Sequence, residues 1–261
     1  MAGSAGARVS RGTALVVGLA TLALLAPFAA PYAPDAIDLA SRRAAPSLAH
    51  WFGTDDLGRD VLSRALFGGR VSMAIGLLSA LVAVSVGVAV GAVAGYVGGW
   101  VDAVLMRLTD AVLSMPRLLL LMVAAATLQP SVPALVLLVG AVGWMETARV
   151  TRASVRALAG SDYVTAALAL GAGHVRVVWR HVLANAAAAI RTAAVLAVGR
   201  AILVESALSF FGVGVQPPDA TWGSMLYQAQ SAMSTEPWLA LVPGACIVLT
   251  VGGLTWVADR P

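Results

Sequence analysis

The residue types that most often carry out chemistry are scarce in this chain. It has one cysteine, three histidines and no lysine. A Walker A loop needs a lysine to reach the β- and γ-phosphates of ATP, so the chain cannot carry a standard P-loop. His174 and His181 are seven residues apart, which is about 10 Å along a helix and too far for both to hold one metal ion. We expect no metal site and no cofactor, and any ATP must be hydrolysed by a partner.

Catalysis within the membrane would need a nucleophile and a base, or metal ligands, at bilayer depth. The apolar stretches contain neither an HExxH motif nor a paired serine and histidine. Cys246 lies inside an apolar run, where a small buried residue is the commoner role than a reactive thiol. We therefore expect no catalytic residue and no enzyme.

The composition is that of a membrane protein. Of its 261 residues, 59% are hydrophobic and 11% are charged, whereas a soluble domain carries about a quarter charged residues. Several apolar runs approach or exceed the roughly 20 residues that a helix needs to cross the hydrocarbon layer. The net charge of +4 comes from arginine alone. These arginines stand at the ends of apolar runs and in two polar stretches, which favours membrane topology over a nucleic-acid partner.

We expect an all-α membrane protein with six transmembrane helices. The first run is longer than the apolar core of a secretory signal, so this span should be retained. Six spans place both termini on the same side of the membrane, after a tail of residues 1–12. The expected spans are residues 13–31, 71–95, 101–128, 131–148, 183–211 and 238–258.

One span carries a regular row of small residues. Gly87, Gly91 and Gly95 recur every four positions in the run from Val71 to Gly95. Small residues at this spacing let a neighbouring helix approach closely in lipid. We therefore predict a helix–helix contact along this row.

Charges interrupt the third and fifth spans, which should therefore face protein or a water-filled cavity. Arg107 and Asp110 are three residues apart and could pair on one helix face. Together with Glu205 they are the candidates for the translocation pathway or a gate. For Glu205, a pairing with Arg200 or a position in the membrane interface is the commoner explanation.

Two polar segments stand out between the spans. Residues 32–70 form a loop in which Val61, Leu62, Ala65 and Leu66 recur at helical spacing, and this pattern predicts a short helix lying in the membrane interface. Residues 149–185 form the second segment. Each segment carries five arginines, so only the arginines at positions 8, 11 and 260 favour cytoplasmic termini by the positive-inside rule.

The second segment contains a candidate docking element. Asp162 can cap a short helix, and Ala166, Ala167 and Gly171 would give that helix a face of small residues. Such a helix suits docking into a groove on a partner protein, although a plain amphipathic connector fits the same pattern.

This segment resembles the EAA loop of the permeases of bacterial ABC importers. Thr165 replaces the usual glutamate and Ala184 the usual proline. The matching positions are Tyr163, Val164, Ala166, Ala167, Gly171, Arg180, His181 and Asn185. The resemblance implies that the following residues couple the chain to an ATPase: Asp162, Tyr163, Val164, Thr165, Ala166, Ala167, Gly171, Arg180 and His181.

Four further blocks are similar to the C-type permease subunits of dipeptide, oligopeptide and nickel importers. They are residues 51–72, 95–110, 205–226 and 237–244. The resemblance implies a type I (MetI-like) permease domain over 71–258, containing the cytoplasmic EAA loop 149–185, with 32–70 extracytoplasmic. It also implies the bacterial inner membrane, a second related permease, two cytoplasmic ATPases that bind ATP-Mg, and an external solute-binding protein.

The alternatives concern energy source and substrate. An ion-coupled secondary transporter often shows internal repeats, and we find no convincing repeat. Dipeptides or oligopeptides are the leading substrates, and nickel or another small solute stays open.

Overall fold

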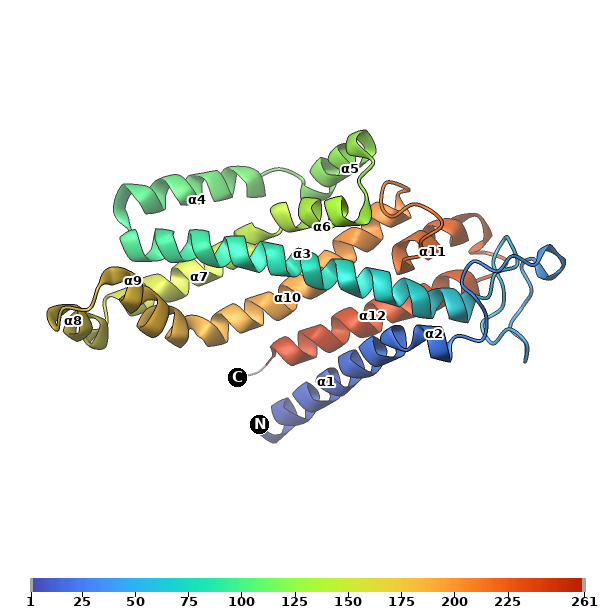
Figure 1. Ribbon diagram of the computed structural model, residues 1–261, viewed down its shortest axis with the longest axis horizontal. Helices are drawn as coiled ribbons and strands as arrows, with labels where there is room; N and C mark the ends of the chain where they lie inside the picture. Colours follow the sequence, from blue (N-terminus) through green and yellow to red (C-terminus); the bar gives the residue numbers. More distant parts are fainter. Residues whose placement is uncertain (1, 260–261) are drawn as a thin grey trace.

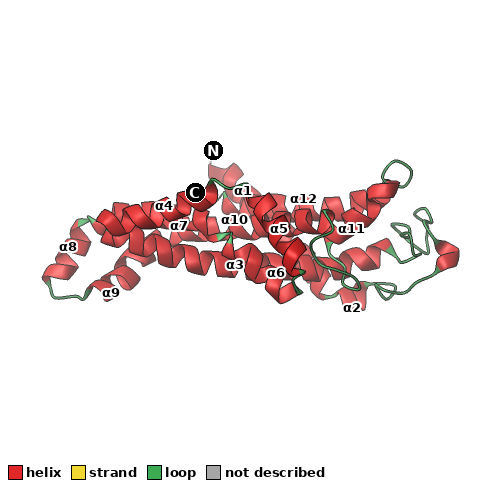
Figure 2. Ribbon diagram, turned by 90° about the horizontal axis from the view of Figure 1, so that it is seen from above, coloured by secondary structure: helices red, strands yellow, loops and turns green. Residues whose placement is uncertain are grey.

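The computed structural model describes residues 2–259, and the side chains from Ser10 to Asp259. This part of the chain is an elongated bundle of helices without a β-strand (Figures 1 and 2). The helices are α1 (Ala2–Leu24), α2 (Ala26–Ala29), α3 (Val61–Val97), α4 (Gly99–Leu113), α5 (Arg117–Leu128), α6 (Val132–Ala141), α7 (Trp144–Ala159), α8 (Asp162–Ala169), α9 (His174–Val177), α10 (Leu183–Phe210), α11 (Trp222–Ala229) and α12 (Trp238–Ala258). A π-helical turn, Val178–Val182, joins α9 to α10.

Three helices are long and apolar enough to cross a membrane. They are α3, the continuous helix His174–Phe210 and α12. The predicted sixth span, 238–258, is confirmed as α12. Two bent pairs, α4 with α5 and α6 with α7, raise the number to five if each pair is one span. The apolar part of α1, Ser10–Leu24, is shorter, so the described residues do not establish all six expected spans.

Helix α3 is longer than the sequence pattern predicts. The prediction of a separate interfacial helix around Val61–Leu66 is wrong, because these residues form the first turns of α3. Asp60 caps the helix by accepting a hydrogen bond from the backbone N–H of Ser63 at 2.8 Å, and no proline interrupts the next 37 residues. A helix of this length spans about 55 Å, well beyond the hydrocarbon layer of about 30 Å.

The third and fourth expected spans are each broken. The third divides at Ser114–Pro116, where α4 and α5 meet at 75°. Pro116 has no backbone N–H and disfavours helical geometry at Met115, so the helix ends before it and α5 begins after it. The fourth divides at Val142–Gly143 with a bend of 41°.

The glycine row on α3 packs against α7, as predicted. A Cβ on Gly87 would lie 2.6 Å from the carbonyl oxygen of Trp144, and one on Gly95 would lie 2.7 Å from that of Arg152. A Cβ on Gly91 would meet the carbonyl oxygen of Ala148 in the same way. The two steps of four residues between these three glycines keep α3 and α7 in parallel register, because each glycine admits one backbone carbonyl of the partner helix.

Candidate functional site

The segment predicted to dock a partner lies at one end of the bundle, where α8 and α9 project beyond the other helices (Figures 1 and 2). A tight turn joins them at Gly171, whose φ of +84° belongs to the left-handed region. A Cβ on Gly171 would meet no atom within 4 Å. The glycine is therefore required by the backbone of the turn and not by a close neighbour within the chain.

Buried valines fix the two short helices to the bundle. Val164 of α8, Val177 of α9 and Val182 of the π-helical turn form one apolar cluster with Val155 of α7 and Ala92 of α3. All five side chains are buried. Because the cluster joins the projecting helices to two membrane helices, a displacement of α8 would be transmitted to α3 and α7 through packed side chains.

Polar contacts reinforce this attachment. The Tyr96 hydroxyl on α3 lies 2.7 Å from Nδ1 of His174 on α9. The amide of Asn185 donates to the carbonyl oxygen of His181 at 2.6 Å and to the Tyr163 hydroxyl at 3.5 Å. Four positions of the EAA-like motif or its flanks are thus involved in orienting the hairpin.

An ion network ties α4 to α7 near the same end. Asp102, in the first turn of α4, is buried and accepts two hydrogen bonds from Arg152 and a third, of 3.2 Å, from Arg156. Two guanidinium groups share one carboxylate, and paired donors of this kind fix orientation as well as contributing energy. The network holds α7, which leads directly into α8.

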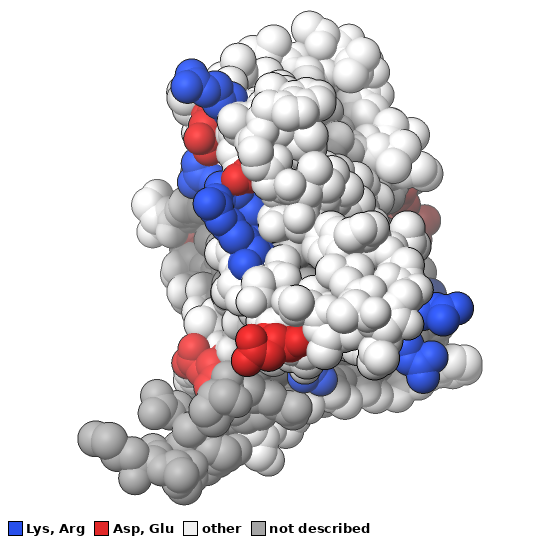
Figure 3. Space-filling view, turned by 90° about the vertical axis from the view of Figure 1, so that its left-hand side faces the viewer, with Lys and Arg blue, Asp and Glu red and all other residues white. Residues whose placement is uncertain are grey.

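The hairpin exposes three large apolar side chains. Leu170, Val175 and Trp179 are 89%, 74% and 70% exposed. Figure 3, which views this end, shows a largely uncharged surface with charged side chains along its left edge and around its lower part. Exposed large apolar side chains that lie together are typical of a protein–protein contact.

The small residues predicted to share one helix face do not all lie on the same side of α8. Ala166 is exposed, whereas Ala167 packs partly against the valine cluster. The predicted cap is also wrong, since Ser161 occupies the N-cap position and Asp162 is the first helical residue. An aspartate in the first turn still interacts favourably with the helix dipole.

The two departures from the usual motif have local structural consequences. Thr165 is exposed, and its hydroxyl donates to the carbonyl oxygen of Ser161 at 3.3 Å, so it presents no carboxylate. Ala184 lies at the start of α10, where a proline would lack the N–H that continues the helix. The chain instead runs without a break from His174 to Phe210. Arg180 and His181 lie in its π-helical turn, an irregularity often found at functional sites.

The pairings predicted for the pathway candidates are wrong. Asp110 binds Arg149 of α7 at 2.5 Å, not Arg107. Arg107 is exposed on α4 and makes no ion pair with the described residues. Arg200 pairs with Glu146, not with Glu205. In each case a tertiary partner from another helix replaces a neighbour in sequence.

Glu205 is instead a buried structural centre. Its side chain is fully buried and accepts hydrogen bonds from Ser209 at 2.8 Å and from Ser72 at 3.3 Å. Ser72 in turn accepts from the backbone N–H of Trp222 at 3.1 Å. The carboxyl group therefore joins α10, α3 and the first turn of α11.

A cluster of charged residues that the sequence did not predict lies where the broken spans bend. It consists of Arg117 at the start of α5, Glu146 in the first turn of α7, and Arg200 of α10. The three residues are far apart in sequence. The sequence does contain a signal for this cluster, because all three are charged residues inside apolar runs. Arg117 directly follows Pro116, and Glu146 lies three residues after Gly143.

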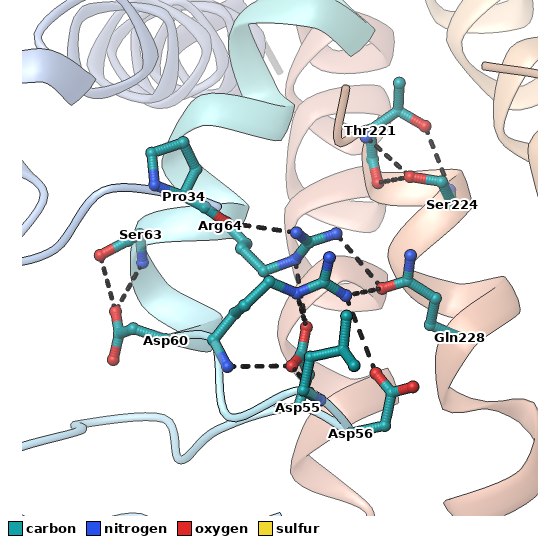
Figure 4. Close-up of polar contacts among 11 residues, drawn as sticks. Pro34, Asp55, Asp56, Asp60, Ser63, Arg64, Thr221, Ser224 and Gln228 are labelled. Carbon is teal, nitrogen blue, oxygen red and sulfur yellow. Dashed lines mark hydrogen bonds and ion pairs between the residues drawn. The ribbon is translucent and has the colours of Figure 1, made fainter. Parts of the chain in front are cut away.

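The opposite end of the bundle is held by a buried ion cluster (Figure 4). Asp55 accepts from the Arg59 side chain at 2.7 Å and pairs with Arg64 at 3.4 Å. Both arginines also donate to the side-chain oxygen of Gln228 on α11, each at 3.2 Å. Arg64 reaches the carbonyl oxygen of Pro34 as well. These contacts fix the 32–60 segment and α11 to the start of α3.

Among the described residues, no three His, Cys, Asp or Glu side chains lie close enough together to hold a metal ion. The interactions described above are ion pairs, hydrogen bonds and apolar contacts.

Comparison with known proteins places these features in a family. Residues 87–260 match the family described as "Binding-protein-dependent transport system inner membrane component". The chain is 36% identical over 245 residues to the probable D,D-dipeptide transport system permease protein of Escherichia coli, covering 94% of this chain and 82% of that protein. It is 34% identical over 248 residues to the oligopeptide transport system permease protein of Bacillus subtilis, covering 95% of this chain and 81% of that one. The resemblance predicted from the motifs is confirmed.

Proposed function

The chain belongs to the family of inner membrane components of binding-protein-dependent transport systems, and on this premise we propose that it is one of two permease subunits of an ATP-driven peptide importer. The permease domain would cover residues 71–258. The choice of peptides as substrate is supported by the names of relatives that match over more than nine-tenths of this chain.

The observation that carries the coupling mechanism is the exposed hairpin of α8 and α9. Leu170, Val175 and Trp179 offer apolar side chains to a partner, in the manner of a helix that inserts into a groove. Val164 and Val177 attach the same hairpin to the membrane helices. A cytoplasmic ATPase that binds the hairpin would therefore move the spans as well.

The proposed assembly has four protein partners for this chain. A second, related permease would complete the pathway, two ATPases would bind ATP-Mg, an external binding protein would deliver the peptide, and lipid would surround the spans. The hairpin and both termini would be cytoplasmic, and the 32–70 segment extracytoplasmic. ATP binding would close the ATPases and switch the pathway between outward- and inward-open states as a rigid-body transition. This subunit would carry out no covalent step.

Reconstitution tests the proposal. The two permeases, two ATPases and binding protein are placed in liposomes, and uptake of a labelled tripeptide is measured with ATP inside. Uptake should require ATP, the binding protein and this chain together. Uptake by this chain alone, driven by an ion gradient without ATP, would contradict the proposal and favour a secondary transporter.

A further inference from the structure

We propose that Arg117, Glu146 and Arg200 form a binding site for the carboxylate of the transported peptide, on the side of the chain that faces the translocation pathway. The inference rests on the proposed peptide transport and adds to it a recognition site within the membrane, distinct from the surface that docks the ATPase.

The three side chains lie together although three helices supply them. Arg200 of α10 forms an ion pair with Glu146 of α7. A nitrogen of Arg117, at the start of α5, lies 4.0 Å from the other Glu146 oxygen. Arg117 also reaches the break between α6 and α7, because a Cβ on Gly143 would lie 3.4 Å from its Nη2 atom. The carboxylate of Glu146 thus sits between two guanidinium groups.

The cluster lies inside the apolar part of the bundle. Arg117 follows the 75° break between α4 and α5, and Glu146 follows the 41° break between α6 and α7. Arg200 lies within the continuous span that ends at Phe210. Breaks of this kind within membrane helices are tolerated where the backbone is covered by protein or lines a water-filled cavity.

The partial exposure of these three side chains indicates whether the cluster faces lipid or the translocation pathway. The side chains of Arg117, Glu146 and Arg200 are 26%, 39% and 35% exposed, so this chain alone does not enclose them. Charges that face lipid at this depth are costly, and charged residues within spans face a bundle interior or a water-filled cavity. The face that presents this cluster is therefore the pathway face.

The cluster carries one positive charge in excess. Two guanidinium groups share one carboxylate, and Nε of Arg117 is buried without an acceptor. A guanidinium group binds a carboxylate through a planar fork of donors. An arriving peptide carboxylate would bind the exposed donors of these two guanidinium groups and neutralise the excess charge. The Asp55 cluster at the far end carries no excess charge, because the two carboxylates of Asp55 and Asp56 balance the two guanidinium groups of Arg59 and Arg64.

The test uses the reconstituted complex with trialanine and its C-terminal amide. Arg117→Gln and Arg200→Gln should each raise the KM for trialanine uptake about tenfold, the factor expected from losing one charge-assisted hydrogen bond, and should leave amide uptake unchanged. Glu146→Gln should have the opposite effect and lower the KM for trialanine, because it removes the internal competitor for both arginines. Arg191→Gln, at an exposed position on the same α10 helix, is the matched control and should match the unmodified complex.

Three outcomes overturn the inference. One is a KM for trialanine within twofold of the control in both arginine variants. Another is an equal loss for trialanine and its amide, and the third is impairment by all three substitutions, which would mark a purely structural cluster. If the amide is not transported at all, the opposite signs of the arginine and Glu146 variants decide the question. Absence of ATP-dependent peptide uptake by the unmodified complex would instead refute the proposed function.

Discussion

The hydroxyl of Tyr96 on α3 and Nδ1 of His174 on α9 lie 2.7 Å apart, and this contact joins a membrane helix directly to the hairpin proposed to bind the ATPase. Tyr96→Phe removes the hydrogen bond and keeps the ring. A hydrogen bond of this type contributes about 0.5–1.5 kcal/mol, so the backbone amides of α9 should exchange about 2–10 times faster. Hydrogen exchange measured by mass spectrometry checks this. Tyr227→Phe, at the far end of the bundle, should leave exchange in α9 unchanged, and equal exchange in the two variants would refute the coupling role of Tyr96.

Gly91 lies where α3 packs directly against the backbone of α7. Gly91→Leu places a side chain where the carbonyl oxygen of Ala148 now lies, so the two helices must separate. Overpacking of this kind costs about 1–3 kcal/mol, and the thermal midpoint of the protein in detergent should fall. Gly18→Leu is the control, because a Cβ at Gly18 meets no atom within 4 Å. Equal midpoints for the two variants would mean that the glycine row does not set the helix contact.

Glu205 should act through its hydrogen bonds. Glu205→Ala leaves the hydroxyls of Ser209 and Ser72 without their acceptor and opens a cavity, at an expected cost of about 2–5 kcal/mol in the free energy of unfolding. Glu205→Gln keeps the volume and one acceptor oxygen, so its cost should be less than half as large. Denaturation in detergent compares them. If both variants lose stability equally, the negative charge and not the hydrogen bonding is what the site requires.

Asp55 is expected to hold together the end of the bundle opposite the α8–α9 hairpin. Asp55→Ala leaves Arg59 and Arg64 without their shared carboxylate, and removing one partner of a buried ion pair costs about 3–5 kcal/mol. Asp56 is nearly half exposed and lies 3.7 Å from Arg59, so Asp56→Ala should cost less than about 1 kcal/mol. Limited proteolysis of the 32–60 segment reports the difference. Similar cleavage of both variants would show that the cluster does not anchor this segment.

Sequence reasoning succeeded where the signal is local and periodic. The apolar run 238–258 and the row of Gly87, Gly91 and Gly95 both appear in the structure as predicted. The short helix that follows Ser161 also agrees with the local pattern, but Gly171, expected on its face of small residues, lies beyond the end of α8 in a left-handed turn.

The failures involve contacts between distant residues. Asp110 could have paired with Arg107 by spacing alone, but Arg149 of another helix binds it. The cluster of Arg117, Glu146 and Arg200 depends on where two broken spans bend, and spacing along one helix cannot reveal this. A polar stretch before Val71 suggested a separate interfacial helix because charge pattern marks solvent exposure. Arg64 in the first turn of α3 is instead buried, and it forms an ion pair with Asp55 of the preceding segment.

The claim that the α8–α9 hairpin docks an ATPase is tested most directly by chemical protection. In a Cys246→Ser background, single cysteines replace Leu170, Val175 or, as a control at the other end, the almost fully exposed Leu48. Maleimide labelling is then measured in detergent with and without the purified ATPases. Binding of the ATPases should slow labelling at positions 170 and 175 at least tenfold and leave position 48 unchanged. Equal labelling rates at 170 and 175 in an assembled, ATP-hydrolysing complex would contradict the docking role of the hairpin.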